Sequence, residues 1–97
     1  MDICTYILFS KKLNRFYTGA CQESLSQRID KHNTHFYKGK HFTDAAEDWE
    51  LFLKIPTETY AHALRLERKI KSMKSIKYID NLNKYPEMVV KIIEETR

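Results

Sequence analysis

Residues 4–21 read CTYILFSKKLNRFYTGAC, and they predict two β-strands joined by a short polar turn. The runs 4–9 and 16–21 are rich in β-branched and aromatic residues, which favour strands. The segment between them is polar and contains Asn14, a residue that suits turns. Two strands with so short a connection must be antiparallel, because parallel strands need a long crossover. The stretch therefore predicts a β-hairpin and excludes a doubly wound parallel sheet.

The residues after the hairpin predict a helix and then a loop. Ser24 with Gln27 three residues later is a capping-box pattern, which is typical of a helix N-terminus. The expected buried stripe of this helix has helical spacing and consists of Leu25, Ile29 and Phe36. We expect the helix to end before Gly39. The loop is expected over residues 37–48, and its acidic side chains are Asp44, Glu47 and Asp48.

The rest of the chain predicts a third strand and three helices. Residues 49–55 favour a strand, which Pro56 ends. Thr57 or Thr59 can cap the next helix. Its apolar side chains follow a 3.6-residue period and are Ala63, Leu66, Ile70 and Met73.

A short helix is expected over 76–81 and a last one over about 86–96, with Pro86 in its first turn. The apolar face of the last helix would be Met88, Val89, Ile92 and Ile93. The element order is then β-β-α-β-α-α-α. It predicts an α+β fold in which a three-stranded, mostly antiparallel sheet is flanked by helices. The length of 97 residues fits a single domain over 1–97.

Composition narrows the class of protein. The net charge of +4 is compatible with a nucleic-acid partner without requiring one. The spacing of Cys4 and Cys21 matches neither a redox CxxC pair nor a zinc knuckle, so two reduced thiols are expected. No apolar run approaches the roughly 20 residues that a membrane-spanning helix needs. The early apolar stretch follows an acidic Asp2, which is not typical of a signal peptide. We therefore expect a cytoplasmic protein with no membrane partner.

Three groups of side chains can carry chemistry, and each also has a purely structural interpretation. If Tyr17 pairs with Leu8, then Tyr6 and Tyr17 share a face of the hairpin, because side chains alternate along a strand. Two phenols on one face can bind a water and a phosphate. The alternative is that both are ordinary strand aromatics.

Arg28 and His32 are four residues apart and are neighbours on a helix surface. An arginine can give a phosphoryl group two hydrogen bonds, and a histidine can accept a proton near neutral pH. The alternative is a solvated helix face. Glu67 borders an apolar helix face, where a carboxylate needs a cation. That cation is either a divalent metal ion or, alternatively, Lys71 one turn later.

The order of these residues resembles the GIY-YIG nuclease superfamily. Thr5-Tyr6-Ile7 and Tyr17-Thr18-Gly19 resemble the paired tripeptides that name it. The segment LSQRIDKHN at 25–33 resembles its arginine helix, and ALRLERKIK at 63–71 resembles the block with its metal-binding glutamate. Leu82-Asn83 resembles the asparagine that closes the motif set. The resemblance covers about residues 4–84 and is nearest to the small stand-alone bacterial members.

The resemblance implies a metal-dependent DNA endonuclease that hydrolyses phosphodiester bonds. Its catalytic residues would be Tyr6, Tyr17, Arg28, His32, Glu67 and Asn83. Tyr6 would help to activate the attacking water, with His32 as proton acceptor or relay. Tyr17 would orient the water or the scissile phosphate, and Arg28 would stabilise the charge that grows on it. Glu67 would hold one divalent metal ion, Mg²⁺ or Mn²⁺. Asn83 would support the phosphate or the packing of the site.

Two departures from the family pattern bear on activity. Thr5 stands where the family usually has glycine, and threonine is a good strand residue. The loop after Phe42-Thr43 is acidic here and basic in many relatives, and acidic groups there would repel phosphate. His41 resembles a loop histidine of some relatives.

A basic run surrounds the glutamate of the second helix, and DNA would be bound by Arg65, Arg68, Lys69, Lys71 and Lys74. We expect weak sequence preference, strong salt dependence and a structure- or damage-directed role such as DNA repair. Two alternatives stay open. One is a non-catalytic nucleic-acid-binding module of the same fold. The other is a protein-interaction subunit that forms a homodimer through the C-terminal helix.

Overall fold

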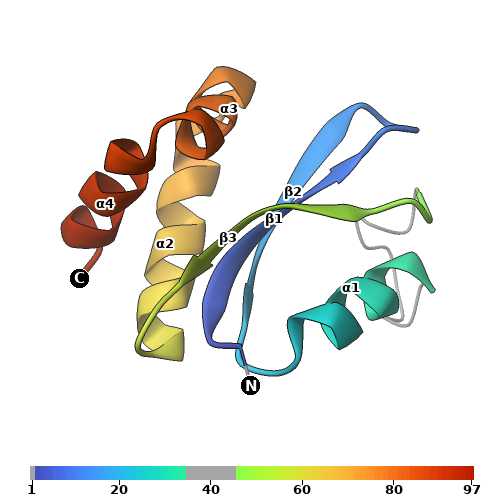
Figure 1. Cartoon of the computed structure of the whole chain (residues 1–97), viewed down its shortest axis with the longest axis horizontal. Coiled ribbons are helices and arrows are strands. Elements are labelled where there is room, and N and C mark those ends of the chain that lie inside the picture. The colour runs from blue at the N-terminus through green and yellow to red at the C-terminus, as the bar shows by residue number, and fades with distance from the viewer. Residues whose placement is uncertain (1, 35–45) are drawn as a thin grey trace.

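The central strand of the sheet is β1 (Cys4–Ser10), and it pairs with β2 (Arg15–Cys21) on one side and β3 (Glu50–Pro56) on the other. Both neighbours are antiparallel to β1. The computed structural model describes residues 2–34 and 46–97 (Figure 1). The predictions about five residues fall outside these ranges: Phe36, His41, Phe42, Thr43 and Asp44. The prediction of a three-stranded antiparallel sheet is confirmed.

Helices cover both faces of the sheet. Their bounds are α1 (Leu25–Asn33), α2 (Tyr60–Met73), α3 (Ile76–Lys84) and α4 (Pro86–Glu95). Figure 1 shows α1 apart from the other three helices, with the sheet between them. This is the α+β order that the sequence predicted. None of the helices in the described part of the chain is both long enough and apolar enough to cross a membrane.

Residues of β1 contribute to the core on both faces of the sheet. Tyr6 and Leu8 belong to a cluster with Leu25 of α1 and Trp49, just before β3. Ile7 lies in a second cluster, which is completed by side chains from β3 and the other three helices: Ile55, Leu66, Ile70, Leu82 and Ile92. A strand buried on both faces needs an uninterrupted apolar run, and residues 6–9 supply one.

Side-chain caps set where the helices begin. The Ser24 hydroxyl accepts the amide of Gln27 at 3.5 Å, as the capping box predicted. Of the two candidate threonines, Thr59 caps α2 and accepts the amide of His62 at 3.1 Å. The sequence analysis did not identify Ser75 as the cap of α3. Pro86 occupies the first turn of α4, as expected.

Two expectations about the helices were wrong. Met73 was expected in the buried stripe of α2, but it is 42% exposed. Lys74 follows it in the left-handed conformation, with φ 46°, so the helix ends there. Met73 lines an open pocket with Lys69 and Tyr78 instead of joining the buried stripe. The third helix runs to Lys84 rather than 81, because Leu82 is 1% exposed and extends its buried face.

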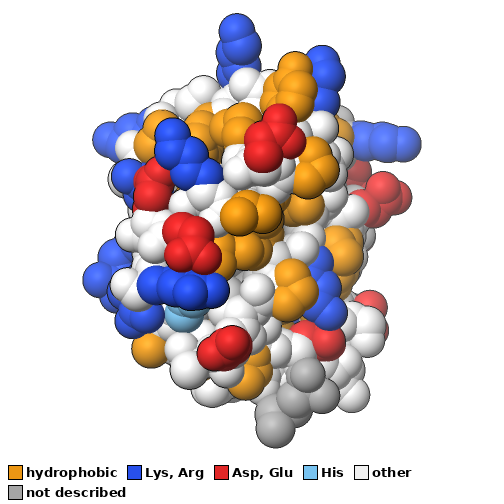
Figure 2. Space-filling model, turned by 60° about the vertical axis from the view of Figure 1, so that its left-hand side comes forward, with side chains coloured by type: hydrophobic (Ala, Val, Ile, Leu, Met, Phe, Trp, Pro, Cys, Tyr) orange, Lys and Arg blue, Asp and Glu red, His pale blue; other side chains and the backbone are white. Residues whose placement is uncertain are grey.

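The apolar face of α4 packs against the core of its own chain. Ile92 is buried, and Met88, Val89 and Ile93 are partly buried against the second cluster. Figure 2 brings this side of the molecule forward, and hydrophobic side chains gather in its middle with charged side chains of both signs around them. Val90 is 60% exposed and is not part of the face that the sequence analysis assigned to dimerisation. Dimerisation through α4 stays a prediction.

Both cysteines are buried and free, as the spacing predicted. They lie opposite each other on β1 and β2. Burial raises the pKa of the Cys4 thiol to about 11, and the adjacent Cys21 adds to that shift. At neutral pH Cys4 is therefore a neutral core side chain.

Asp48 stabilises the turn between β1 and β2 with two hydrogen bonds. Its Oδ1 accepts the Ser10 hydroxyl at 2.6 Å, and its Oδ2 accepts the amide of Lys12 at 3.0 Å. These hydrogen bonds, led by the one from Ser10, hold the pKa of Asp48 below its ordinary value of 3.8. One of the acidic residues expected to repel phosphate therefore has a structural role in the hairpin.

We expect Asp48→Asn to be less stable than the wild type above its ordinary pKa of 3.8. The folded carboxyl has the lower pKa, so its stabilising effect is present above the unfolded value and is lost as the pH falls through the folded one. Thermal unfolding followed by circular dichroism from neutral to acidic pH measures the difference. Asp80→Asn, at an exposed carboxylate of α3, is the matched control. A stability difference that does not shrink in acid would contradict this role.

Candidate active site

The hairpin register places the two tyrosines on one face. Leu8 pairs with Tyr17, and Gly19 pairs with Tyr6. Tyr6 and Tyr17 therefore both point toward α1, and their ring centroids are 6.5 Å apart. The two tyrosines were expected to share a face only if Tyr17 pairs with Leu8, and this is the pairing in the structure.

The hydroxyl of Tyr6 lies between two residues of α1. Its Oη is 3.0 Å from His32 Nε2, and Arg28 Nε donates to the same oxygen at 3.2 Å. Arg28 and His32 are one helical turn apart, so the helix presents both on the same side. Tyr6 is fully buried, and His32 is 3% exposed. The three side chains form a hydrogen-bonded cluster inside the protein.

This cluster can stabilise negative charge and accept a proton at a single oxygen. A guanidinium that donates to a phenol oxygen favours negative charge on it. The histidine ring can take or return a proton near neutral pH. Tyr17 extends the cluster, because its ring centroid is 5.0 Å from that of His32.

Gly19 makes room for the ring of Tyr6. A side-chain carbon built on Gly19 would lie 2.5 Å from Tyr6 Oη and 2.6 Å from its Cζ, closer than atoms in proteins approach. The motif that contains Gly19 did not by itself predict this role. The strand register could have predicted it, because a register that pairs Leu8 with Tyr17 also pairs Tyr6 with Gly19.

Two further residues that the sequence analysis missed hold α1 in place. Glu23 accepts hydrogen bonds from Arg28 Nη1 and Lys31 Nζ, both at 3.4 Å. Partial desolvation opposes the charged form of Glu23, but these two cations hold its pKa below the ordinary value. Asn33 donates to the carbonyl of Trp49 at 2.9 Å and accepts its amide at 2.7 Å. The end of α1 is thereby tied to the start of β3.

Glu67 comes from α2, in the opposite layer of the fold, and it is connected to Tyr17 through Lys71. Its side chain is 21% exposed, and Lys71 Nζ lies 3.0 Å from its Oε2. The same ammonium lies 5.7 Å from the ring centroid of Tyr17. The ion pair expected as the structural alternative is therefore present. It also connects the glutamate helix to the tyrosine face.

Thr5 anchors the turn of α2 that carries Glu67. Its hydroxyl donates to the carbonyl of Ala63 at 2.7 Å, and Thr5 is fully buried. Ala63 precedes Glu67 by four residues, so its carbonyl belongs to the same helical turn. The residue that departs from the family pattern thus links the central strand to this helix.

The structure divides the basic run of α2 between two faces. Arg65 Nε donates to the carbonyl of Thr96 at 2.8 Å, and Lys69 lies 3.9 Å from Glu95, so both face the C-terminal end of the chain. Arg68 is exposed. Lys71 and Lys74 line a cavity next to Tyr17. Of the five residues expected to bind DNA, Lys71 and Lys74 line this cavity, and Lys71 Nζ also lies 5.7 Å from the ring centroid of Tyr17.

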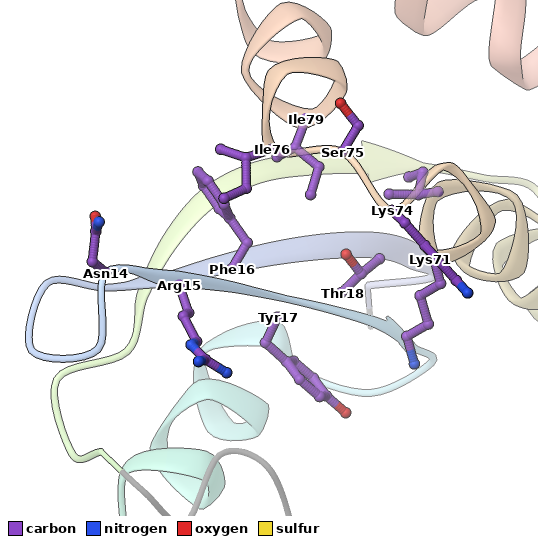
Figure 3. Close-up of a pocket in the computed structure, with 11 residues that line it drawn as sticks. Asn14, Arg15, Phe16, Tyr17, Thr18, Lys71, Lys74, Ser75, Ile76 and Ile79 are labelled. Atoms are coloured by element: carbon purple, nitrogen blue, oxygen red, sulfur yellow. The ribbon is translucent and has the colours of Figure 1, made fainter.

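That cavity has a volume of about 840 Å³ and lies between β2, the end of α2 and the start of α3 (Figure 3). Figure 3 shows Phe16 and Thr18 on one side of β2, and Arg15 and Tyr17 on the other. Asn83 is not among its lining residues. Asn83 is exposed in the last turn of α3, and no contact joins it to the other expected site residues within the described ranges.

Glu67 is the carboxylate best placed to hold a metal ion. The described residues contain no group of three or more histidine, cysteine or acidic side chains that could enclose one. Mg²⁺ is commonly held by one or two carboxylates, with water and substrate phosphates completing its coordination. One partly exposed carboxylate, paired with a lysine that lines the cavity, fits that pattern.

The α+β fold and the buried cluster of Tyr6, Arg28 and His32 agree with one class of protein. Residues 2–85 match the sequence profile described as the GIY-YIG catalytic domain, which is most of the 97-residue chain. The chain belongs to the GIY-YIG family. Neither the curated proteins nor the solved structures contain a significant match to it.

Gly19→Ala should displace the Tyr6 ring. We expect a loss of about 1–3 kcal/mol in the free energy of unfolding, because the added carbon overpacks a filled core. Urea denaturation measures it. In a Tyr6→Leu background the same substitution should cost less, since the clashing ring is gone. A Gly19→Ala protein as stable as the wild type would show that the ring does not depend on this space.

Thr5→Val should lower the free energy of unfolding by about 1 kcal/mol, because it removes one buried hydrogen bond and nearly preserves shape. Thr5→Ser keeps the hydroxyl and serves as the control for that bond. Guanidinium denaturation of the three proteins compares them. Equal stability of the valine variant and the wild type would mean that the hydrogen bond to Ala63 adds nothing.

Proposed function

We propose that this protein is a DNA endonuclease that hydrolyses phosphodiester bonds with one divalent metal ion, Mg²⁺ or Mn²⁺. The observation that carries the proposal is the position of the Tyr6 hydroxyl between His32 Nε2 and Arg28 Nε. Membership of the GIY-YIG family supports the reaction class. Hydrolysis of a phosphodiester needs an activated water, neutralisation of charge and a positioned phosphate, and these residues offer a group for each need.

The substrate phosphate would first meet the partly exposed groups. The side chain of Arg28 is 28% exposed and that of Glu67 is 21% exposed, and Tyr17 is half-buried. Arg28 donates to a phosphate oxygen and stabilises the charge that grows there as water attacks phosphorus. Tyr17 orients the water or the phosphate.

The buried pair Tyr6 and His32 would accept the proton of the attacking water. As Tyr6 Oη takes the proton from the water, the hydroxyl's own proton passes to His32 Nε2, so the tyrosine ends neutral and the proton is held on the imidazole. Arg28 stabilises the oxygen while it carries negative charge. General-base assistance of this kind contributes about 10²–10⁴-fold to a rate.

Glu67 would hold the metal ion. Lys71 balances the charge of the carboxylate in the present structure and would release it when a divalent cation binds. A divalent ion held by Glu67 would supply Lewis-acid chemistry for the hydrolysis. The freed ammonium is then available to a neighbouring phosphate at the same edge of β2.

A second candidate is the non-catalytic nucleic-acid-binding module. The Lys71–Glu67 ion pair favours it, because a paired carboxylate needs no metal. The buried contact of Tyr6 with His32 favours the enzyme, because phosphate binding alone requires no proton acceptor behind the arginine.

We expect Glu67→Gln and Arg28→Ala each to lower the rate of DNA cleavage by on the order of 10²–10³-fold. The assay uses supercoiled, branched and single-stranded DNA with Mg²⁺, Mn²⁺ or chelator. Glu87→Gln, an exposed carboxylate of α4, is the matched control and should retain full activity. Chelator should abolish cleavage.

Cleavage that persists in Glu67→Gln would contradict the proposed metal site. Binding of DNA without cleavage of any substrate would favour the binding module instead.

A further inference from the structure

The cavity beside Tyr17 combines an apolar wall with a basic rim. Phe16, Ile70, Ile76 and Ile79 contribute the wall, and Arg15, Lys71 and Lys74 contribute cations. Ile76 is 66% exposed, the most exposed of the large hydrophobic side chains in the described ranges. Figure 3 shows Phe16 directed toward Ile76 and Ile79, with Lys71 and Lys74 on the side toward α2.

We propose that this cavity binds one unpaired nucleobase of a DNA strand whose phosphates lie along Lys71 and Lys74. The proposal rests on the proposed function and assigns the substrate class: DNA that has an unpaired nucleotide next to the bond that is cut. Tyr17 and Lys71 line the cavity and also contact the cluster around Tyr6 and Glu67.

Charge and shape together favour a nucleotide. The rim cations suit the phosphate backbone, and an apolar wall suits the face of a base, which packs on flat apolar surfaces without regard to sequence. A volume of about 840 Å³ lies within the range of pockets that enclose small ligands. A base inside a duplex has both faces stacked and cannot enter such a cavity, so the base must be unpaired.

A polar group at the same wall can meet the edge of a base. Thr18 lines the cavity and offers a hydroxyl to the base. The Ser75 hydroxyl instead accepts the amide of Tyr78 at 3.1 Å and caps α3. This bond holds the start of α3, and with it Ile76, in position over β2. The apolar wall is thereby built into the fold.

The test measures binding without cleavage. Fluorescence anisotropy in chelator compares three labelled probes of equal length: single-stranded DNA, the same strand with abasic sites, and a blunt duplex. Ile76→Ser should weaken binding of the single strand by about tenfold, because it removes an apolar side chain from the contact with the base. It should leave the abasic strand and the duplex within about twofold. Ile76→Trp should tighten binding of the single strand alone.

Matched controls come from α4. Val90→Ser removes an apolar side chain that is 60% exposed, and Lys91→Gln removes an exposed lysine away from this cavity. Neither should distinguish the three probes. Lys74→Gln should weaken binding of all three and reduce the slope of log affinity against log salt by about 1.

The proposal is overturned if Ile76→Ser behaves like Val90→Ser, or if it weakens all three probes equally. Its failure can be separated from failure of the proposed function. If no DNA is cut but Ile76→Ser selectively loses the single strand, the cavity assignment holds and the nuclease proposal fails. If cleavage requires Glu67 but Ile76→Ser binds every probe like the wild type, the cavity assignment alone fails.

Discussion

The hydroxyl of Tyr6 receives a hydrogen bond from Arg28 and lies within hydrogen-bonding distance of His32, and the arrangement of the site depends on this point. The ring reaches α1 only because Gly19 on the paired strand has no side chain. It is kept there by a core packed on both faces of β1. A buried polar network of this kind tolerates little displacement, because each group that loses its partner is left without water to replace it.

Two consecutive residues of β1 connect the layers of the fold. Tyr6 points toward α1, whereas Thr5 points to the other face and binds the carbonyl of Ala63 in α2. One face of β1 therefore contacts the helix that carries Arg28 and His32, and the other face contacts the helix that carries Glu67. Lys71 completes the connection around the edge of β2, where it meets both Glu67 and Tyr17.

Tertiary packing, and not their order in the sequence, determines where the charged side chains of α2 lie. Arg65 and Lys69 are bound at the C-terminal end of the chain, while Lys71 and Lys74 line the cavity beside Tyr17. Asp48, in an acidic segment expected to repel phosphate, is held by the hairpin turn. The basic run of α2 is therefore not a single surface for a polyanion, because two of its cations are engaged at the C-terminal end and two line the cavity.

The sequence by itself determined the element order, the hairpin, the capping serine of α1 and the proline at the start of α4. These features depend on local periodicity and on hydrogen bonds between near neighbours, which a linear pattern records. It also identified the tyrosines, Arg28, His32 and Glu67 as a set, through a resemblance whose motifs keep their order.

The tertiary structure alone decided how those residues meet. The strand register placed Tyr6 over Gly19. The packing of α2 on β1 brought the carbonyl of Ala63 within hydrogen-bonding distance of the Thr5 hydroxyl. The left-handed turn at Lys74 exposed Met73, and the same junction of α2 and α3 opened the cavity over β2. Each outcome depends on contacts between residues far apart in the chain. Local propensity does not encode such contacts, because their free energy exists only once the layers have packed.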